Sequence, residues 1–315
     1  MIGKILDKIK EADSIIIIGH VSPDGDCLGC QFGLKEIIKD TFNKEKVYVV
    51  GEESVTLAYM GKLDTVTDKQ FRESLVIFVD LANNERAADK RWSIAKEVIK
   101  IDHHFTSEVF GSLCYIDYKV AAAAEIIARI AMENNLVVNK YAANSLLTGI
   151  ITDSGNFRYT GVSADTFRIT AFLVDKGADV VELNQKIAMV SYNELKIKGY
   201  VIEHMQTTEE GFAYCLITKQ TMEEYHVIYE EASNAINSLA NIYGYPIWAL
   251  ILEKDTEYRI RLRSNGPRID ILANKYGGGG HQLASGCRIY KQSEIHQFSV
   301  DADEVIREFK NREVK

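Results

Sequence analysis

The stretch Val98-Ile99-Lys100-Ile101-Asp102-His103-His104 decides how the first part of this chain folds. The largely apolar run over residues 98–101 predicts a short buried strand, and the loop after it begins with an Asp and two His residues. Three other segments place Asp or His directly after an apolar element: residues 20–26 follow 15–18, Asp80 follows 75–79, and Asp153 follows 146–151. A parallel sheet gathers such side chains beyond the carboxyl ends of its strands, so these segments predict one shared site.

Strand-like and helix-like segments alternate through the first part of the chain. Strands are expected over residues 14–19, 47–50, 75–79 and 98–101, with an edge strand over 113–116. Helices are expected over residues 2–12, 27–40, 85–95, 121–134, 140–152, 164–176 and 179–189. This alternation predicts an α/β fold in which helices cover a parallel sheet.

The character of the sequence changes near residue 190. Residues 191–210 are expected to form a polar linker helix, and residues 211–315 a smaller α/β domain with a strand pair at 247–253 and 258–263. We therefore expect an N-terminal parallel-sheet domain with flanking helices over residues 1–190, joined by the linker helix to a smaller C-terminal α/β domain.

Composition limits the possible functions. Of the 315 residues, 46% are hydrophobic, but no apolar run approaches the roughly 18 residues that a membrane-spanning helix needs. The formal net charge is −8, whereas proteins that grip long nucleic acids usually carry a basic excess. A nucleic-acid substrate is therefore expected to be short. The five scattered cysteines, without an export signal, predict reduced thiols and a cytoplasmic protein.

The four segments supply a candidate set of metal ligands: His20, Asp24, Asp26, Asp80, His103 and Asp153. Imidazole nitrogens and carboxylate oxygens together suit hard or borderline divalent ions such as Mn²⁺. Four carboxylates in one place repel one another, and two divalent cations would neutralise them. Two ions roughly 3.5–4 Å apart can share a hydroxide that attacks a phosphoryl group, which predicts a two-metal phosphoesterase mechanism.

Each of these residues also has a structural explanation. Asp24 and Asp26 precede a helix, where either can be the N-cap, and the same helix offers N–H groups to a phosphate. Asp80 can simply end a strand, and the two histidines can lie on the surface or form a partly buried pair. Cys27-x-x-Cys30 has zinc-ligand spacing, but no second pair accompanies it, so two small helix residues are favoured.

Five motifs in order resemble the DHH phosphoesterase superfamily. They are His20-x-x-Pro23-Asp24-x-Asp26, the strand-ending Asp80, Asp102-His103-His104, Asp153-Ser154-Gly155, and a glycine-rich stretch over residues 277–286 that looks like the signature of the DHH-associated C-terminal domain. The resemblance spans nearly the whole chain. The length and the lack of extra domains resemble the stand-alone oligoribonuclease and pAp phosphatase branch, often called nano-RNases.

The resemblance implies a role for each matching residue. One ion would be held by His20, Asp24 and Asp80, and the other by Asp26, Asp80, His103 and Asp153, so that Asp80 bridges the ions. Asp102 would orient the two histidines, and His104 would face the substrate phosphate or assist protonation of the leaving group. The far end of the substrate would be bound by Arg263, by His281 and by a loop over residues 277–280 that contains Gly278, Gly279 and Gly280. Glycines let the backbone N–H groups of such a loop approach a phosphate.

The implied function is hydrolysis of short oligoribonucleotides to mononucleotides, and of 3′-phosphoadenosine 5′-phosphate (pAp) to AMP, with two Mn²⁺ ions as cofactors. The expected partners are short RNA and small nucleotides, with no membrane partner; a homodimer is an open alternative. Other functions are also open: a cyclic dinucleotide phosphodiesterase acting on c-di-AMP or linear pApA, an inorganic pyrophosphatase, and a catalytically inactive nucleotide-binding module. The glycine-rich stretch argues against the pyrophosphatase, and the complete ligand set argues against the inactive module.

Overall fold

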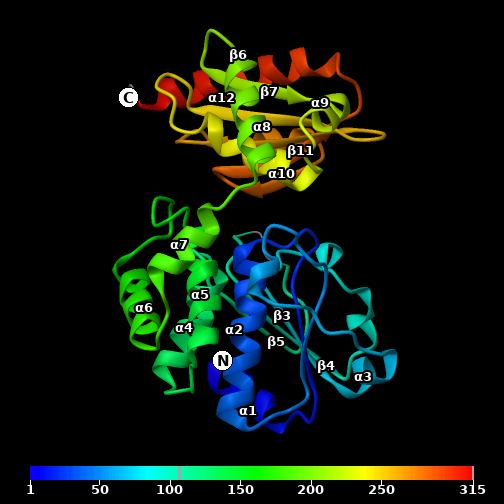
Figure 1. Ribbon diagram of the computed structural model, residues 1–315, viewed down its shortest axis with the longest axis vertical. Helices are drawn as coiled ribbons and strands as arrows, with labels where there is room; N and C mark the ends of the chain where they lie inside the picture. Colours follow the sequence, from blue (N-terminus) through cyan, green and yellow to red (C-terminus); the bar gives the residue numbers. More distant parts are fainter. Residues whose placement is uncertain (106–107, 314–315) are drawn as a thin grey trace. The chain divides into compact units, whose positions relative to one another are not determined.

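Two units make up the chain in the computed structural model, which describes residues 1–105 and 108–313. The first unit is Met1–Met189 and the second is Val190–Lys315. Each unit has its own sheet and its own buried core (Figure 1). Among the helices of the described residues, none is both long and apolar enough to cross a membrane. Each unit therefore has the layered architecture of a separate domain.

A five-stranded sheet with the order β2-β1-β3-β4-β5 forms the centre of the first unit. The strands are β1 (Ile15–Ile18), β2 (Val47–Val50), β3 (Leu75–Val79), β4 (Glu97–Asp102) and β5 (Leu113–Ile116), and neighbouring strands are parallel throughout. The isoleucines of β1 are fully buried because this strand has a neighbour on each side and both of its faces are covered. The prediction of a parallel α/β sheet is confirmed.

Helices cover the sheet of the first unit. They are α1 (Ile2–Glu11), α2 (Gly25–Phe42), α3 (Asp68–Glu73), α4 (Ala123–Glu133), α5 (Lys140–Asp153), α6 (Ala164–Asp175) and α7 (Val180–Ala188), with a 3₁₀ turn, η1 (Ala58–Met60). On one face α2 packs on β1, β2 and β3, α4 packs on β4, and α5 packs against both of these helices (Figure 1). On the other face Phe71 of α3 belongs to a second apolar cluster that includes Phe78 and Trp92.

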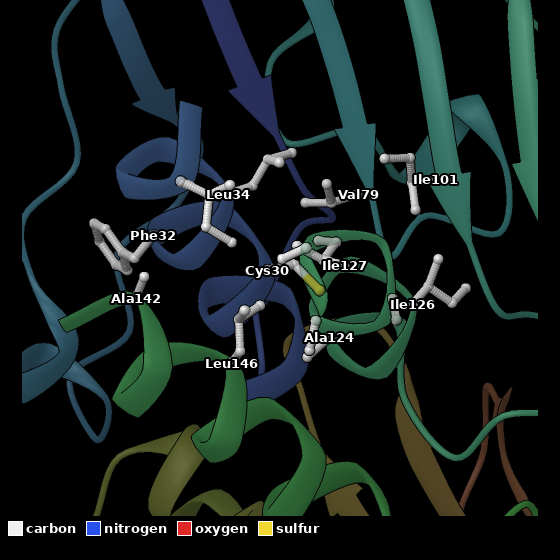
Figure 2. Close-up of a cluster of buried hydrophobic side chains, with 14 of the residues drawn as sticks. Cys30, Phe32, Leu34, Val79, Ile101, Ala124, Ile126, Ile127, Ala142 and Leu146 are labelled. Atoms are coloured by element: carbon white, nitrogen blue, oxygen red, sulfur yellow. The ribbon is translucent and has the colours of Figure 1, made fainter. Parts of the chain in front are cut away.

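Helix α2 lies at the centre of the largest apolar core. Figure 2 shows Cys30, Phe32 and Leu34 of α2 close to Ala142 and Leu146 of α5. The same cluster includes Val79, Ile101, Ala124, Ile126 and Ile127 from the sheet and α4. This core therefore ties the ends of β3 and β4 to α2, α4 and α5, which are the elements that carry the predicted metal ligands or contact them.

One predicted helix of the first unit is not formed. We predicted a helix over residues 85–95, and this is wrong because the segment contains two separate 3₁₀ turns, η2 (Asn84–Arg86) and η3 (Lys90–Ile94). The side chains of Asn83 and Asp89 each accept a backbone N–H from the turn that follows them. Such local hydrogen bonds compete with those of a continuous helix and interrupt it.

A six-stranded mixed sheet with the order β10-β11-β9-β8-β7-β6 forms the second unit. Its strands are β6 (Gln206–Thr207), β7 (Phe212–Ile217), β8 (Ile247–Glu253), β9 (Tyr258–Ser264), β10 (Gly279–His281) and β11 (Ala284–Ile289). Strands β7 and β8 are parallel, and the other neighbouring strands are antiparallel. The predicted pairing of β8 with β9 is confirmed.

The two faces of this sheet are covered by different helices. On one face α11 (Asp270–Lys275) and α12 (Glu294–Glu313) pack on residues such as Ile260 and Leu262. On the other face lie α8 (Tyr192–Glu203), α9 (Lys219–Glu224), α10 (Tyr229–Asn234) and the 3₁₀ turn η4 (Ala235–Leu239), over a core that includes Trp248. The second unit is therefore a three-layered α/β domain.

Helix α8 lies in the segment 191–210 that we expected to be a polar linker. Ile197 and Val201 of this helix are fully buried, in the same apolar cluster as Trp248. Their spacing of four residues places them on one face of the helix, which is the face that packs. The helix is thus part of the second unit, which begins at Val190.

Candidate metal centre

Asp80 occupies the central position of the candidate site, directly after β3. Because β3 lies between β1 and β4, the residues that follow those two strands flank Asp80. Its Oδ2 atom lies 3.3 Å from Nε2 of His20, and its Oδ1 atom lies 3.5 Å from Nε2 of His103. One buried carboxylate therefore contacts both histidines, with a different oxygen toward each.

Asp24 serves the helix and the site at once. It is the N-cap of α2, where its Oδ1 atom accepts the N–H groups of Asp26 at 3.1 Å and Cys27 at 3.0 Å. Its other oxygen lies 3.8 Å from Nε2 of His20. The N-cap alternative is thus confirmed for Asp24, and it does not exclude a ligand role because the two oxygens have different contacts.

Asp26 is held by a helix that is far away in the sequence. Its carboxylate is 1% exposed and accepts the backbone N–H groups of Ala123 at 2.6 Å and Ala124 at 2.9 Å, at the start of α4. Helix α4 has no side-chain cap of its own, so Asp26 satisfies these N–H groups. The Oδ2 atom of Asp26 also lies 3.8 Å from Nε2 of His103. Sequence reasoning did not identify the two amides, because backbone groups carry no sequence signal.

Gly149 makes room for the Asp26 carboxylate. A Cβ atom at this position in α5 would lie 2.7 Å from Oδ1 of Asp26 and 2.7 Å from Cβ of Ala124. The close approach of α5 to both residues therefore requires glycine here. Sequence reasoning did not select Gly149, since a glycine inside a helix also occurs without any functional reason.

Asp153 reaches the site from the end of a helix. It is the last residue of α5, and its Oδ2 atom lies 3.2 Å from Nε2 of His103. Its side chain is 31% exposed, whereas Asp26 and Asp80 are almost completely buried. The sheet edge thus supplies His20, Asp80 and His103, and helix ends supply the remaining carboxylates.

Asp102 contacts both histidines of the Asp-His-His motif. Its Oδ1 atom accepts the backbone N–H of His103 at 2.9 Å and lies 2.8 Å from Nδ1 of His104. A carboxylate can only accept, so Nδ1 of His104 carries a hydrogen in this contact. That atom of His104 also lies 3.7 Å from Oδ1 of Asp80. Asp102 therefore fixes the orientation of the His104 ring and the backbone of His103.

A buried lysine lies behind Asp102. Nζ of Lys100 is 3.5 Å from Oδ2 of Asp102, and it donates to the carbonyl oxygens of Ala82 at 3.2 Å and Glu108 at 2.8 Å. Burial lowers the pKa of Lys100, and the Asp102 carboxylate opposes this shift. Lysine is rarely buried completely, yet Lys100 is 0% exposed in the middle of β4. No role for Lys100 was predicted from the sequence.

The charges in the site do not compensate one another. Burial by itself lowers the pKa of His103, but the Asp80, Asp153 and Asp26 carboxylates raise it well above its usual value. Burial opposes ionisation of Asp80, yet His103 and His20 hold its pKa well below the usual range. Burial and the neighbouring carboxylates raise the pKa of Asp26, and burial raises the pKa of Asp153 to about 7. The four carboxylates of the cluster therefore outnumber its two imidazoles, and the cluster has an excess of negative charge.

The side chains fit divalent cations. The ligand atoms of Asp26, Asp80 and His103 lie within 4.8 Å of one another, and so do those of His20, Cys27 and Asp80. Asp80 belongs to both groups. Its Oδ1 atom is buried and makes no hydrogen bond among the described residues; it faces Nε2 of His103 at 3.5 Å and Nδ1 of His104 at 3.7 Å, which leaves it able to bind a cation. Nitrogen and carboxylate ligands around a shared Asp suit a centre with more than one ion.

The two cysteines of α2 remain thiols beside this centre. Burial raises the pKa of Cys27 to about 12 and that of Cys30 well above its usual value. Sγ of Cys30 lies 3.5 Å from Oδ1 of Asp26, so this cysteine packs against a carboxylate of the site. These contacts support the interpretation of Cys27 and Cys30 as small helix residues.

The residues predicted in the second unit come together on its sheet. Arg263 of β9 and His281 of β10 both pair with Ala284 of β11, so they flank it on the same row of the sheet. The glycine-rich segment that we expected to be a loop is partly strand, because Gly279 and Gly280 belong to β10. A Cβ atom at Gly280 would lie 2.6 Å from the carbonyl oxygen of Ala284, so close strand packing by itself explains this glycine.

Comparison with known proteins identifies the family. Residues 14–150 match the model of the DHH family N-terminal domain, and residues 213–308 match the DHHA1 domain. The chain is 36% identical over 92% of its length to the probable bifunctional oligoribonuclease and PAP phosphatase NrnA of Streptococcus mutans, of which it covers 94%. The chain belongs to the DHH family. This DHH-family chain is also 32% identical over 97% of its length to NrnA of Bacillus subtilis, of which it covers 98%.

Two further matches bear on the fold and on the alternatives. An exopolyphosphatase-related protein of Bacteroides fragilis has a similar fold, with a TM-score of 0.88, 24% identity and coverage of 97% of both chains. The cyclic-di-AMP phosphodiesterase PdeA of Listeria monocytogenes is 26% identical over 87% of this chain, which covers only 44% of that enzyme. The cyclic dinucleotide alternative therefore has a weaker match than the NrnA relatives.

Proposed function

We propose that this chain hydrolyses short oligoribonucleotides to mononucleotides, and pAp to AMP and phosphate, at one metal-dependent site. The observation that carries the proposal is the position of Asp80, a buried carboxylate with one oxygen toward His20 and the other toward His103. The relatives named for oligoribonuclease and PAP phosphatase activity, which this chain matches over nearly its whole length, support the choice of substrates.

Two divalent ions, preferably Mn²⁺, would be held by the predicted ligands. His20, Asp24 and Asp80 would bind one ion, and Asp26, Asp80, His103 and Asp153 the other. The donor set supports this assignment, since it contains only imidazole and carboxylate groups. When bound, such ions supply charge neutralisation at the phosphoryl oxygens and a more acidic water.

His104 is the residue of this chain that would move a proton. Hydrolysis forms a bond from a water oxygen to phosphorus and breaks the bond from phosphorus to the leaving oxygen, which takes up a proton. Nδ1 of His104 is hydrogen-bonded to Asp102 at 2.8 Å, which orients the ring and directs the proton transfer to Nε2. Asp102 would thereby act through His104, as the carboxylate of other His–Asp pairs does.

The second unit would supply affinity for nucleotides. Arg263 offers a planar guanidinium for a phosphate, and His281 lies on the same row of the sheet. Gly278 precedes the strand residues Gly279 and Gly280, of which Gly280 is exposed, and none of the three has a side chain of its own that would hinder access to the backbone. This arrangement supports recognition of a phosphate in the substrate beyond the one that is attacked.

A product time course with Mn²⁺ tests the proposed function. An RNA dinucleotide, pAp, c-di-AMP and pyrophosphate are supplied at equal concentrations to the purified protein, and the products are separated by chromatography. We expect rapid hydrolysis of the dinucleotide and pAp. A clear preference for c-di-AMP would replace the proposal by the cyclic dinucleotide function. Bound metal without hydrolysis of any substrate would indicate an inactive nucleotide-binding module.

A further inference from the structure

Two exposed aromatic side chains are in contact at the edge of the first unit's sheet. Phe105 directly follows His104 after the end of β4, and Tyr118 is the second residue after β5. Because β4 and β5 are neighbouring parallel strands, both residues lie at the carboxyl edge of the sheet, as the candidate metal centre does. The centroids of the two rings are 5.3 Å apart, and their planes make an angle of 89°. The rings therefore form an edge-to-face pair beside the centre.

Packing of the first unit does not account for this pair. Phe105 is 65% exposed and Tyr118 is 55% exposed, which makes them the two most exposed aromatic side chains among the described residues of this unit. Neither ring belongs to the apolar clusters that these residues form. Phe110, by contrast, packs on Phe78 and Trp92, so the core already has an aromatic contact from the segment after β4. The pair thus offers apolar surface to a ligand.

The backbone that carries the two rings is tied to Asp102. The carbonyl oxygen of Asp102 accepts the N–H of Asp117 at 3.0 Å, one residue before Tyr118. The Oδ1 atom of Asp102 accepts the N–H of His104 at 3.4 Å, one residue before Phe105. Both rings are therefore attached to the residue that orients His104, and a ligand that binds to them needs to order little of the backbone.

The geometry of the pair suits a flat aromatic ligand. In an edge-to-face pair, the ring that contributes its edge leaves both of its own faces uncovered by the other ring. A planar group that stacks on one of these faces also meets the second ring at the corner. Nucleobases stack on phenylalanine and tyrosine in this way when proteins bind single-stranded nucleic acids. Every substrate of the proposed function contains such a base.

We propose that Phe105 and Tyr118 form the stacking site for the nucleobase of the leaving nucleoside. The inference rests on the proposed function, in which His104 protonates the leaving oxygen. Since Phe105 is the next residue after His104, the nucleoside that carries this oxygen comes to lie beside the two rings. In pAp that oxygen is the 3′ oxygen of AMP, and in an RNA dinucleotide it also belongs to a nucleoside. One stacking site therefore serves both substrates.

The stacking site recognises the base and not the phosphate. A base that stacks away from the reacting phosphorus is held equally in the ground state and in the transition state, so the contact lowers KM and leaves kcat unchanged. The larger ring system of a purine stacks more strongly than a pyrimidine. We therefore expect the KM for pAp to be lower than that for uridine 3′,5′-bisphosphate, and the KM for a base-free analogue to be the highest of the three.

The test replaces Phe105 and Tyr118 together by alanine. In the F105A/Y118A variant we expect the KM for pAp to rise about tenfold, the effect of losing one base-stacking contact, while kcat stays unchanged. The comparison substrate is 1,4-anhydroribitol 3,5-bisphosphate, which has the sugar and both phosphates of pAp but no base. The KM for this base-free analogue should be the same in the variant and in the wild type. Phosphate release in Mn²⁺ measures both reactions.

Two further variants serve as controls. F105Y/Y118F keeps both rings and should keep the wild-type KM for pAp. Y59A/Y290A removes two other aromatic rings, which are 37% and 64% exposed and belong to neither predicted site. This second control should leave the KM for pAp and for the base-free analogue unchanged.

The outcomes separate this inference from the proposed function. An unchanged KM for pAp in F105A/Y118A would overturn the stacking site, and so would an equal rise for the base-free analogue or an equal rise in Y59A/Y290A. If the wild-type protein hydrolyses neither pAp nor an RNA dinucleotide, the proposed function fails. The fluorescence of 2-aminopurine riboside 3′,5′-bisphosphate in Mn²⁺, which falls when the base stacks, then decides about the site alone. Quenching by the wild type that is lost in F105A/Y118A supports the site, and equal or absent quenching rejects it.

Discussion

Replacing Asp80 by Ala is expected to abolish hydrolysis of short RNA and of pAp together. Asp80 contacts both His20 and His103, so its loss removes a ligand from each of the two proposed ion positions. We expect kcat/KM for both substrates to fall by roughly 10³-fold or more, equivalent to about 4 kcal/mol of transition-state stabilisation. Initial rates on an RNA dinucleotide and on pAp at saturating Mn²⁺ measure the effect.

The Asp80 prediction needs a control for non-specific loss of charge. Asp165 is exposed on α6, where it pairs with Arg168, and Asp165→Ala should leave both activities unchanged. Circular dichroism would establish that both variants are folded. If the Asp80 variant kept near wild-type activity on either substrate, the model of a single site with a shared carboxylate would be wrong.

Removal of divalent ions is expected to stop hydrolysis and to destabilise the first unit. Without cations, four carboxylates face two imidazoles, and the buried Oδ1 atom of Asp80 has no hydrogen-bond partner among the described residues. A ligand at 100 times its Kd stabilises a protein by about 2.7 kcal/mol, which corresponds to a Tm increase of roughly 5–10 °C for a unit of this size. Differential scanning calorimetry in Mn²⁺ and in EDTA measures this shift independently of activity.

The Asp80→Ala variant is also the control for the metal effect. Its Tm should respond weakly to Mn²⁺, because the shared ligand is missing. Returning Mn²⁺ to the EDTA-treated wild-type protein should restore both Tm and activity. An identical Tm in Mn²⁺ and EDTA, with undiminished hydrolysis in EDTA, would contradict the metal centre.

Much of the first unit could be predicted because its signals are local. The bounds that short apolar runs predict for β2 and β3 are the bounds that the structure has. This agreement arises because buried parallel strands are apolar along their whole length. Strand ends also explain why His20, Asp80 and His103 could be expected in one place. Neighbouring parallel strands bring their carboxyl ends to the same edge, whatever the sequence distance between them.

Other features depend on contacts that are distant in the sequence and could not be predicted. The amides that hold Asp26 belong to Ala123 and Ala124, nearly a hundred residues later in the chain. Gly149 matters because of a close approach between helices, and Lys100 because a strand carries it into the interior beside Asp102. None of these roles follows from residue type or spacing.

In the second unit, the predicted glycine-rich loop is partly wrong, because two of its glycines pair with β11 as a short strand. Gly279 and Gly280 form a short strand with β11, although glycine has a low strand propensity. The backbones of the two strands approach so closely that a side chain at Gly280 would collide with Ala284. Tertiary pairing thus overrides the local preference for a turn.

Competition between the two proposed substrates is the measurement that tests the central claim most directly. The rate of RNA dinucleotide hydrolysis in Mn²⁺ is measured at increasing concentrations of pAp, and the rate of pAp hydrolysis at increasing concentrations of the dinucleotide. A single site predicts purely competitive inhibition in both directions, with each Ki equal to the KM of that compound as a substrate. Hydrolysis of both compounds without mutual inhibition would contradict a single site centred on Asp80.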